Sequence, residues 1–398
     1  MKIAHISIYP EKDKKHSKGG GVASYTKNLI TNIPYQKNDQ VFILCNKIEG
    51  RYDKYEEDGI TVVRCFDKSP KFIYQVLKEV KNIKPDTIHI QQELALYGNI
   101  ITAYLLQWLI LFLHRYNTII TLHGVISIKN IDQNFVKENN SSLPAWLVKL
   151  AFIVIYKPLC LFSKTIIVHE KVFKDILVKE YGINSYKINV IPHGIEDLKT
   201  IDKNRALDEL DLPKKKDIVL FMGYLTGYKG LDLLIEGFSE YLKINKNAYL
   251  IIGAGKHPKL YADPKYLVEY NRIKDKAEQY IGLDNHRWEG FIEEQDIKYY
   301  YSASDISIYP YTNQLSSSGP MSLAIGFEKP FLASEVFDNF IENKDILFQK
   351  NPNSLKDSLI EFFKNKESFI KYIQKLKTER LWSTIGKGTY NYYKGFNL

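Results

Sequence analysis

One pattern fills most of this chain: short apolar runs of strand length alternate with segments long enough for a helix. The first series of apolar runs covers residues 3–8, 41–45, 60–63, 87–90, 118–122, 165–168 and 188–191. Strands that alternate with helices pair in parallel, so this series predicts an α/β sheet. A polar, charged interval at residues 196–217 follows Gly194, and we interpret it as a linker.

The alternation then restarts and predicts a second α/β domain of the same plan. Its apolar runs cover residues 218–222, 248–252, 287–289, 305–309, 331–333 and 346–348. A length of 398 residues also exceeds one ordinary hydrophobic core, which favours two domains. Because ligands bind open α/β sheets at the carboxyl ends of strands, functional residues are expected just after strands.

The net charge and the cysteines limit the classes of binding partner and the cellular location that we expect. The net charge of +9 favours anionic partners, namely nucleotide diphosphates, anionic lipid headgroups or nucleic acid. Nucleic acid ranks last, because no zinc-finger spacing, RNP motif or basic helix occurs in the sequence. Cys45, Cys65 and Cys160 lie far apart in apolar settings, which predicts buried thiols rather than disulfides or a zinc site. The amino terminus enters a strand at once without a secretory pattern, so we expect a cytoplasmic location.

Two apolar stretches raise the question of a membrane. Residues 100–113 would form about one helix, too short for a span of roughly 20 residues. Residues 144–164 combine Trp146 and Leu150 with Lys157, a composition that suits a helix lying in a bilayer interface. A helix packed on the sheet is the alternative interpretation.

The segment after the strand at residues 305–309 has the form of a phosphate-binding helix start. Ser317 and Ser318 stand just before the expected helix. Gly319 and Pro320 would open it, and an apolar run follows. Free backbone N–H groups and the positive end of the helix dipole would face a ligand there, which suits a diphosphate. A capped helix without a ligand is the alternative.

Two further strand exits in the second domain carry small or basic residues. The strand at residues 218–222 leads into Gly223 and Tyr224 and then to Lys229, a point charge suited to a diphosphate. The next strand ends in small residues that begin with Gly253. Three phosphate-compatible loops are thus predicted along one edge of one sheet, although a lysine beside a turn is often only a surface residue.

In the first domain, the loop after the first strand contains Gly20 and Gly21 and opens a helix. Glycines let the backbone approach a bulky anionic ligand and leave N–H groups free to point at it. The run is not a G-x-G-x-x-G fingerprint, and a flexible turn is the alternative.

Histidines follow three strands of this domain, at His123, His169 and His193. A neutral imidazole can exchange hydrogen bonds with a sugar hydroxyl, although a single histidine is more often structural. The spacings match no familiar zinc pattern, so a metal site is the weaker interpretation. Glu93 also follows a strand and is the carboxylate best placed to face a cleft, unless it is a solvent-exposed or capping residue.

Together these motifs resemble those of GT-B glycosyltransferases of the retaining family-4 type, over nearly the whole chain. The resemblance rests on GGGVASYTKNL, TLHG, VIPHGIED, FMGYLTGYKGLDLLIEGF, LIIGAG and YTNQLSSSGPMSLAIGFEKPFLAS, in that order. The carboxyl-terminal ERLWSTIGKGTYNYY resembles the last helix of such enzymes, which crosses back to the first domain. The resemblance implies two Rossmann-like domains facing across a cleft: residues 1–197 on the acceptor side, residues 198–375 binding the nucleotide sugar, and residues 376–398 forming the returning helix.

The resemblance also implies an activity. Such an enzyme moves a hexose from a nucleoside-diphosphate sugar to a glycan or lipid-linked acceptor, with retention at the anomeric carbon and without a metal or other cofactor. Polysaccharide biosynthesis would be its setting. The location would be cytoplasmic, with peripheral contact at an anionic membrane as a further expectation.

The family pattern assigns the diphosphate to matching positions of this chain. Lys229 would neutralise the leaving group, and backbone donors at residues 317–320 would share its charge. Gly20 and Gly21 would contribute from the other side of the cleft.

The remaining roles also follow from the resemblance. His123 would be catalytic with Lys229 and Glu93 and would contact the donor sugar, while Glu93 and His169 would lie on the acceptor side. The other expected contacts to the donor sugar or nucleotide are Gly223, Tyr224, Gly253 and Gln314.

Two departures from the family pattern bear on the donor. Many relatives carry two glutamates where this chain has Leu315 and Leu323, and an arginine where it has Tyr224. Gln314 or a nearby serine could take the sugar contact, whereas the ribose contact has no obvious substitute. Two other functions therefore stay open: a sugar-nucleotide epimerase of the same fold, and a non-catalytic subunit that supports a partner enzyme.

Overall fold

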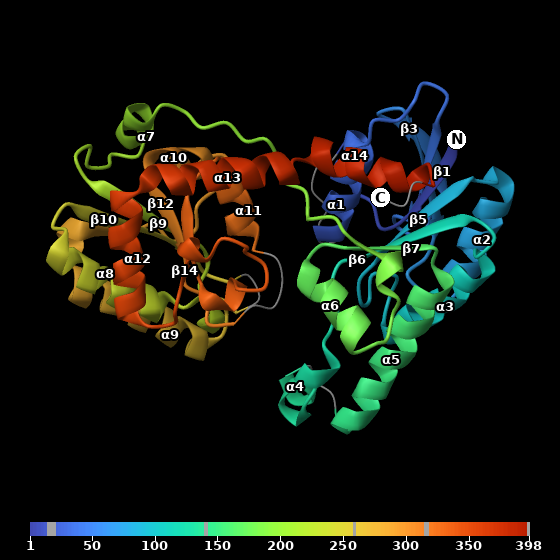
Figure 1. Ribbon diagram of the computed structural model, residues 1–398, viewed down its shortest axis with the longest axis horizontal. Helices are drawn as coiled ribbons and strands as arrows, with labels where there is room; N and C mark the ends of the chain where they lie inside the picture. The colour runs from blue at the N-terminus through green and yellow to red at the C-terminus, as the bar shows by residue number, and fades with distance from the viewer. Residues whose placement is uncertain (14–20, 139–141, 258–259, 314–317, 396–398) are drawn as a thin grey trace. The chain divides into compact units, whose positions relative to one another are not determined.

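The computed structural model describes residues 1–13, 21–138, 142–257, 260–313 and 318–395. The chain forms two compact units, one of Met1–Gly194 with Trp382–Leu398 and one of Ile195–Leu381 (Figure 1). Each unit is built on one largely parallel sheet, which confirms the predicted α/β class. Every predicted strand is present, with small shifts at its ends.

The sheet of the first unit has eight strands in the order β3-β4-β2-β1-β5-β6-β7-β8. The strands are β1 (Lys2–Ile6), β2 (Gln40–Asn46), β3 (Asp53–Glu57), β4 (Ile60–Phe66), β5 (Thr87–Gln92), β6 (Asn117–Leu122), β7 (Thr165–Val168) and β8 (Ile188–Val190). All neighbours are parallel except β3 and β4. The sequence did not predict β3, because its residues DKYEE carry no apolar pattern. A charged strand is tolerated there because it lies at the sheet edge.

The helices of the first unit are α1 (Gly21–Asn32), α2 (Phe72–Ile83), α3 (Ile100–Phe112), α4 (Gln133–Glu138), α5 (Ala145–Phe162), α6 (Lys171–Lys179) and α14 (Trp382–Tyr393). Alternate residues of the central strands enter two different cores, because successive side chains of a strand point to opposite faces. Ile120 and Ile166 join the core under α2, α3 and α5. Ile119 and Ile167 join the core under α1 and α14.

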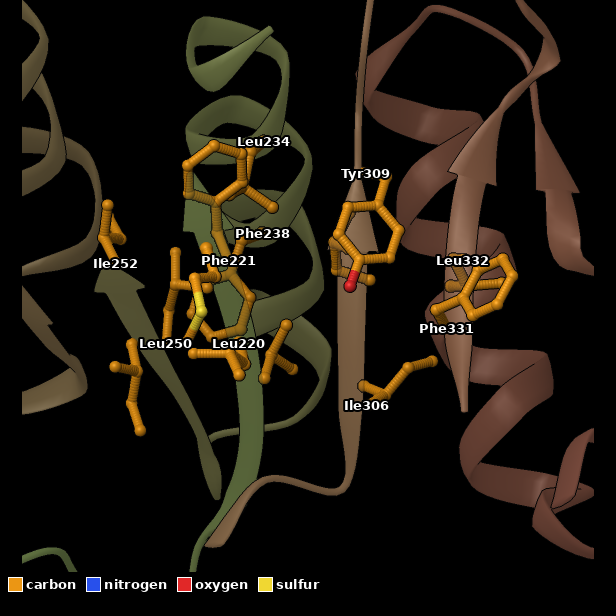
Figure 2. Close-up of a cluster of buried hydrophobic side chains, with 14 of the residues drawn as sticks. Leu220, Phe221, Leu234, Phe238, Leu250, Ile252, Ile306, Tyr309, Phe331 and Leu332 are labelled. Atoms are coloured by element: carbon orange, nitrogen blue, oxygen red, sulfur yellow. The ribbon is translucent and has the colours of Figure 1, made fainter. Parts of the chain in front are cut away.

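The sheet of the second unit has six strands, all parallel, in the order β11-β10-β9-β12-β13-β14. The strands are β9 (Asp217–Tyr224), β10 (Ala248–Gly255), β11 (His286–Trp288), β12 (Ile306–Tyr309), β13 (Phe331–Ser334) and β14 (Leu347–Phe348). The helices are α7 (Lys203–Glu209), α8 (Leu231–Ile244), α9 (Pro264–Ile281), α10 (Ile297–Ala303), α11 (Gly319–Gly326), α12 (Pro352–Lys364) and α13 (Lys366–Arg380). Figure 2 shows the core between α8 and the central strands, where Phe221, Phe238 and Phe331 are fully buried.

The expected linker at residues 196–217 is instead part of the second unit, since it contains the helix α7. The side chain of Asp202 caps α7 by accepting from the backbone N–H of Arg205. Ala206 and Leu207 are buried, and α7 packs on α10. The helix escaped prediction because it is short and its apolar content is confined to these two residues.

The chain passes from the first unit to the second after Gly194 and returns after Leu381, whereas the sequence led us to expect boundaries after residues 197 and 375. The backbone N–H of Ile195 donates to the carbonyl of Arg380 at 2.8 Å, which ties the end of α13 to the start of the second unit. The predicted final helix is therefore divided between α13 and α14. α14 packs on α1 closely, because a Cβ on Gly386 would lie 2.2 Å from the carbonyl oxygen of Asn32.

Two expectations about apolar residues can be compared with the structure. Cys45, Cys65 and Cys160 are free and buried, as predicted. Among the described residues, α5 is the helix long and apolar enough to cross a membrane by length and composition. Its residues Phe152 and Tyr156 are nevertheless buried against the sheet of the first unit.

Candidate functional site

The carboxyl ends of β6, β7 and β8 bring the three predicted histidines together. The rings of His123 and His169 have centroids 5.0 Å apart, and those of His169 and His193 are 5.5 Å apart. Nε2 of His169 lies 3.3 Å from Nδ1 of His123. Parallel strands that end at one edge produce this cluster, as the sequence pattern indicated.

Tyr25 of α1 is the centre of the cluster, and sequence reasoning did not single it out. Its ring centroid is 4.6 Å from that of His123 and 5.1 Å from those of His169 and His193. Trp382 of α14 closes the cluster at 5.1 Å from Tyr25. The short helix α1 is thus fixed to the strand ends by its first turns.

Hydrogen bonds fix the orientation of the imidazoles. Nε2 of His123 lies 2.9 Å from Oε1 of Gln91, and Nδ1 of His169 donates to the carbonyl of Ile191 at 3.0 Å. His123 keeps partial exposure, whereas His169 is 2% exposed. Burial, with a smaller effect of the His169 ring, lowers the pKa of His123 well below its usual value. His123 is therefore neutral at physiological pH, and each of its ring nitrogens has a partner, Gln91 or His169, that a hydroxyl group could replace.

A second polar layer lies beneath this cluster, inside the sheet, and was not predicted. Nδ1 of His89 bonds to the hydroxyl of Tyr393 at 2.6 Å, and Nε2 of His89 bonds to Thr121 at 2.7 Å. Burial lowers the pKa of His89 to about 3. All six residues of β5 (TIHIQQ) are buried, so polar residues in an interior strand were the available signal.

Glu93 and Gly21 lie at the same edge but make few contacts. Glu93 follows β5 and is exposed, and desolvation raises the pKa of its carboxyl group. No hydrogen bond joins Glu93 to the histidine cluster within the described ranges. Gly21 opens α1, and a Cβ there would meet nothing within 4 Å, so packing does not require glycine. Gly20 lies outside the described residues.

In the second unit, Lys229 lies in the turn between β9 and α8 and is only 8% exposed. Its ammonium donates to the hydroxyl of Tyr311 and stands 3.9 Å from the centroid of that ring. The ring of Tyr228 is 5.1 Å away. Burial lowers the pKa of Lys229 to about 8. In the described part of the chain, no carboxylate forms an ion pair with this ammonium.

Gly230 allows this turn to approach the end of β12. It has a φ of +70°, and a Cβ would lie 1.9 Å from the carbonyl oxygen of Pro310. Glycine is therefore required for both its dihedral angle and its size. The close approach brings Lys229 next to Tyr311.

The first turn of α11 completes the arrangement. The hydroxyl of Tyr311 is 2.9 Å from Oγ of Ser318, which also accepts from the backbone N–H of Met321 at 3.3 Å. Ser318 is the N-cap, as the sequence predicted, and Pro320 lies in the first helical turn. A Cβ on Gly319 would meet nothing within 4 Å among the described residues, so packing does not require glycine at this position. Ser317 and Gln314 lie outside the described residues.

Tyr311 links the predicted parts and was missed by sequence reasoning. Its position directly after the strand and Pro310 was the available signal. The ammonium of Lys229, the hydroxyl of Tyr311 and the cap of α11 form one continuous hydrogen-bonded chain. Such a chain places the positive charge of Lys229 beside the first turn of α11, where the positive end of the helix dipole also favours an anion.

Three further predicted residues have distinct surroundings. A Cβ on Gly223 would lie 3.9 Å from both the Lys229 and the Pro320 side chains, so Gly223 lies beside Lys229 and the first turn of α11. Gly253 lies within β10 rather than after it, and a Cβ there would lie 2.5 Å from the side chain of Ile292. Tyr224 is 37% exposed and stacks on Phe291 with centroids 5.9 Å apart.

The described ranges contain no group of three or more His, Cys, Asp or Glu side chains that could hold a metal ion. The histidine cluster is bonded to Gln91, to a backbone carbonyl and within itself. The arrangement can therefore donate to and accept from hydroxyl groups in the first unit and bind an anion in the second.

Comparisons with known proteins cover both units. Residues 19–197 match the family described as Glycosyltransferase Family 4, and residues 202–378 match the family described as Glycosyl transferases group 1. A curated relative, mannosylfructose-phosphate synthase of Agrobacterium fabrum, is 28% identical over 138 residues. This match spans 34% of the chain and only 30% of the relative.

Solved structures resemble the chain over its whole length. Sucrose-phosphate synthase from Thermosynechococcus elongatus has a TM-score of 0.67 at 17% identity, covering 99% of this chain and 98% of that one. The Anabaena protein HepE, solved in complex with UDP, has a TM-score of 0.67 at 14% identity, with 100% of both chains covered. At these identities the likeness shows the fold.

Proposed function

The chain belongs to the group 1 glycosyltransferases of the family-4 type and has their GT-B fold, and on that premise we propose which sugar transfer it performs. It moves a hexose from a nucleoside-diphosphate sugar to a glycan or lipid-linked acceptor. The anomeric configuration is retained and no metal takes part. The observation that carries this proposal is the chain of contacts from Lys229 through Tyr311 to the cap of α11.

Breaking the bond between the anomeric carbon and the diphosphate leaves negative charge on the departing phosphate oxygen. A positioned ammonium and the positive end of a helix dipole stabilise such a charge without reorganising in the transition state. Lys229 is held in place by Tyr311, and α11 begins at the same point. We assign the diphosphate to Lys229, Ser318 and Gly319.

The residues of the first unit suit hydroxyl recognition. His123 is neutral and partly exposed, so a hydroxyl of the donor sugar can bond to its ring by replacing Gln91 or His169 as the partner of one nitrogen. Glu93 is an exposed carboxylate at the neighbouring strand end, and its raised pKa suits an exchange of protons with an acceptor hydroxyl. His169 is buried and supports His123, so we assign it a positioning role on the acceptor side.

A uridine nucleotide is the first donor to test, because HepE was solved in complex with UDP. Purified protein would be incubated with UDP-sugars and GDP-sugars and with oligosaccharide or polyprenyl-linked acceptors. Release of nucleoside diphosphate only when an acceptor is present is the expected result. Proton NMR of the product would report the anomeric configuration, and an excess of EDTA should leave the rate unchanged.

A non-catalytic subunit is the second candidate, favoured by one observation. Leu323 stands where relatives carry a glutamate, and its side chain packs against the core of the second unit. The Lys229→Ala variant separates the two functions. An enzyme should lose turnover by about 100-fold or more, whereas a scaffold has no turnover to lose with any donor and acceptor. Donor interconversion without an acceptor would instead identify an epimerase.

A further inference from the structure

The first unit exposes two neighbouring helices whose outward faces are apolar. α3 and α5 pack side by side (Figure 1). On α3, large exposed side chains stand at Ile101, Tyr104, Trp108 and Phe112. Their spacing of three and four residues places them on one face of the helix.

α5 carries a matching stripe. Trp146, Leu150 and Leu161 are exposed along one face, and Lys157 lies between them in the same register. Trp146 is 66% exposed and Leu161 is 58% exposed, so neither side chain contributes to the core. We call these exposed faces of α3 and α5 together the α3–α5 surface.

The opposite faces of both helices already have partners. Leu106 and Leu109 of α3 and Ile155 and Leu159 of α5 are at most 2% exposed and lie in the core of the first unit. The outward stripes are therefore not needed for packing within the domain. Monomeric proteins rarely expose apolar side chains in such contiguous sets unless the surface binds something.

The charged side chains on α5, and those that directly flank α3 and α5 in the sequence, are of one sign. Residues 94–131 and 142–168 contain no aspartate or glutamate. Basic side chains accompany both helices, at Arg115, Lys149, Lys157 and Lys164. The whole chain has a net charge of +9. A partner that complements this surface must offer an apolar region to the exposed side chains and negative charges to the lysines and arginine beside them.

We propose that the α3–α5 surface docks the protein on an anionic lipid bilayer, with both helices lying in the interface. Tryptophan and tyrosine are the side chains that favour the headgroup region, and lysines reach from there to anionic lipids. The helices do not span the bilayer, because α3 is too short and the inner face of α5 is buried in the domain. The proposal holds for the protein irrespective of the sugar it transfers.

Tryptophan fluorescence of the full chain with vesicles tests the proposal. Trp108 and Trp146 are 44% and 66% exposed, so their emission reports contact with lipid. Vesicles of phosphatidylcholine mixed with phosphatidylserine should shift the emission to shorter wavelength and sediment with the protein. Vesicles of phosphatidylcholine alone, or the mixture at high salt, should bind more weakly, because salt screens the attraction.

Two sets of variants identify the surface, and both leave buried residues untouched. The triple variant Trp108→Ser, Phe112→Ser and Trp146→Ser should lower the partition coefficient by about tenfold or more. The matched control Tyr261→Ser, Val268→Ser and Leu283→Ser removes three large side chains of the second unit that are at least as exposed, and it should bind like the original protein.

Charge is tested separately. Each reversal, Lys149→Glu or Lys157→Glu, should weaken binding to anionic vesicles by roughly fivefold or more. The controls Lys215→Glu and Lys246→Glu make the same charge change at exposed positions of the second unit. If the reversals in the first and the second unit weakened vesicle binding equally, the net charge of the protein alone would explain the binding, and the proposal would be overturned.

Other occupants of the surface give different results. Concentration-dependent dimers that the serine variant abolishes, with no vesicle binding, would assign the surface to a second copy of the chain and overturn the lipid proposal. A protein that neither dimerises through this surface nor binds vesicles would also overturn it. Because vesicle binding is measured without donor or acceptor, its failure is independent of the transferase assay.

Discussion

Lys229 offers a direct test of the site, because the burial of its ammonium costs folding free energy. Burial lowers its pKa from 10.5 to about 8. At about 1.4 kcal/mol per pKa unit, and allowing for partial exposure to solvent, the charged form costs the folded state about 2 to 3 kcal/mol. Lys229→Met removes this cost and loses one hydrogen bond, worth about 1 kcal/mol. The variant should therefore be more stable than the original protein by about 1 to 2 kcal/mol at neutral pH.

The pH dependence of this difference follows from the same shift. The folded pKa, about 8, lies below the unfolded value of 10.5, so between these values the unfolded state binds more protons. The cost is complete below the folded pKa and disappears as the pH rises to the unfolded one. The stability gap between Lys229→Met and the original protein should close across this window. Lys256→Met, which alters an exposed lysine that also contacts an aromatic ring, serves as the control and should show no gap.

Urea unfolding at several pH values measures the gap, and turnover measures the function. We expect Lys229→Met to lower kcat by about 100-fold to 1000-fold while the protein becomes more stable. Added UDP should stabilise the original protein and not the variant, because a bound diphosphate favours the ammonium form. A variant that is less stable at neutral pH, or a gap that is constant with pH, would refute the reasoning.

Three further substitutions have defined outcomes. Gly230→Ala should destabilise the protein by more than about 2 kcal/mol, because φ is +70° and the new Cβ would lie 1.9 Å from the carbonyl oxygen of Pro310. In the control Gly227→Ala the new Cβ would meet nothing within 4 Å, so urea unfolding should show no change in stability. Tyr311→Phe removes the hydroxyl between the ammonium of Lys229 and the cap of α11 and should lower kcat by about tenfold. An unchanged kcat would show that this hydrogen bond does not contribute to catalysis. His123 is already neutral, so the pH–rate profile should show no acid limb near its ordinary pKa of 6.5, and His123→Phe should lower kcat/KM by about 100-fold; a limb at that pH would contradict a neutral ring.

The fold was predictable wherever hydrophobic periodicity carried the information. Interior parallel strands are continuous apolar runs, and such runs were visible from the sequence for both sheets. β3 and α7 escaped because neither depends on an apolar pattern. β3 is an edge strand with one neighbour, and the buried apolar residues of α7 are Ala206 and Leu207. Their positions are set by the neighbouring elements.

For the candidate site, the sequence predicted which strand ends carry functional residues. The parallel topology alone brings His123, His169 and His193 together. The sequence did not indicate that Tyr25 joins these histidines or that Tyr311 joins Lys229 to Ser318, because both resemble any other tyrosine of this aromatic-rich chain. Their roles depend on close approaches between elements distant in sequence, such as the one that Gly230 permits.

The two departures from the family pattern have one electrostatic consequence. In the family pattern, a basic pair stands beside an acidic pair, whereas here Tyr224, Leu315 and Leu323 are neutral and Lys229 alone keeps its charge. Burial is the cause of its lowered pKa, with no carboxylate to offset it in the described ranges. Tyr224 stacks on Phe291 and brings no cation toward Lys229. An ammonium buried without a carboxylate is costly to the fold, and a bound diphosphate supplies the opposite charge. The loss of the glutamates thus strengthens the assignment of Lys229 to the diphosphate, while the hydroxyl contacts of the sugar and ribose fall to neutral groups such as His123.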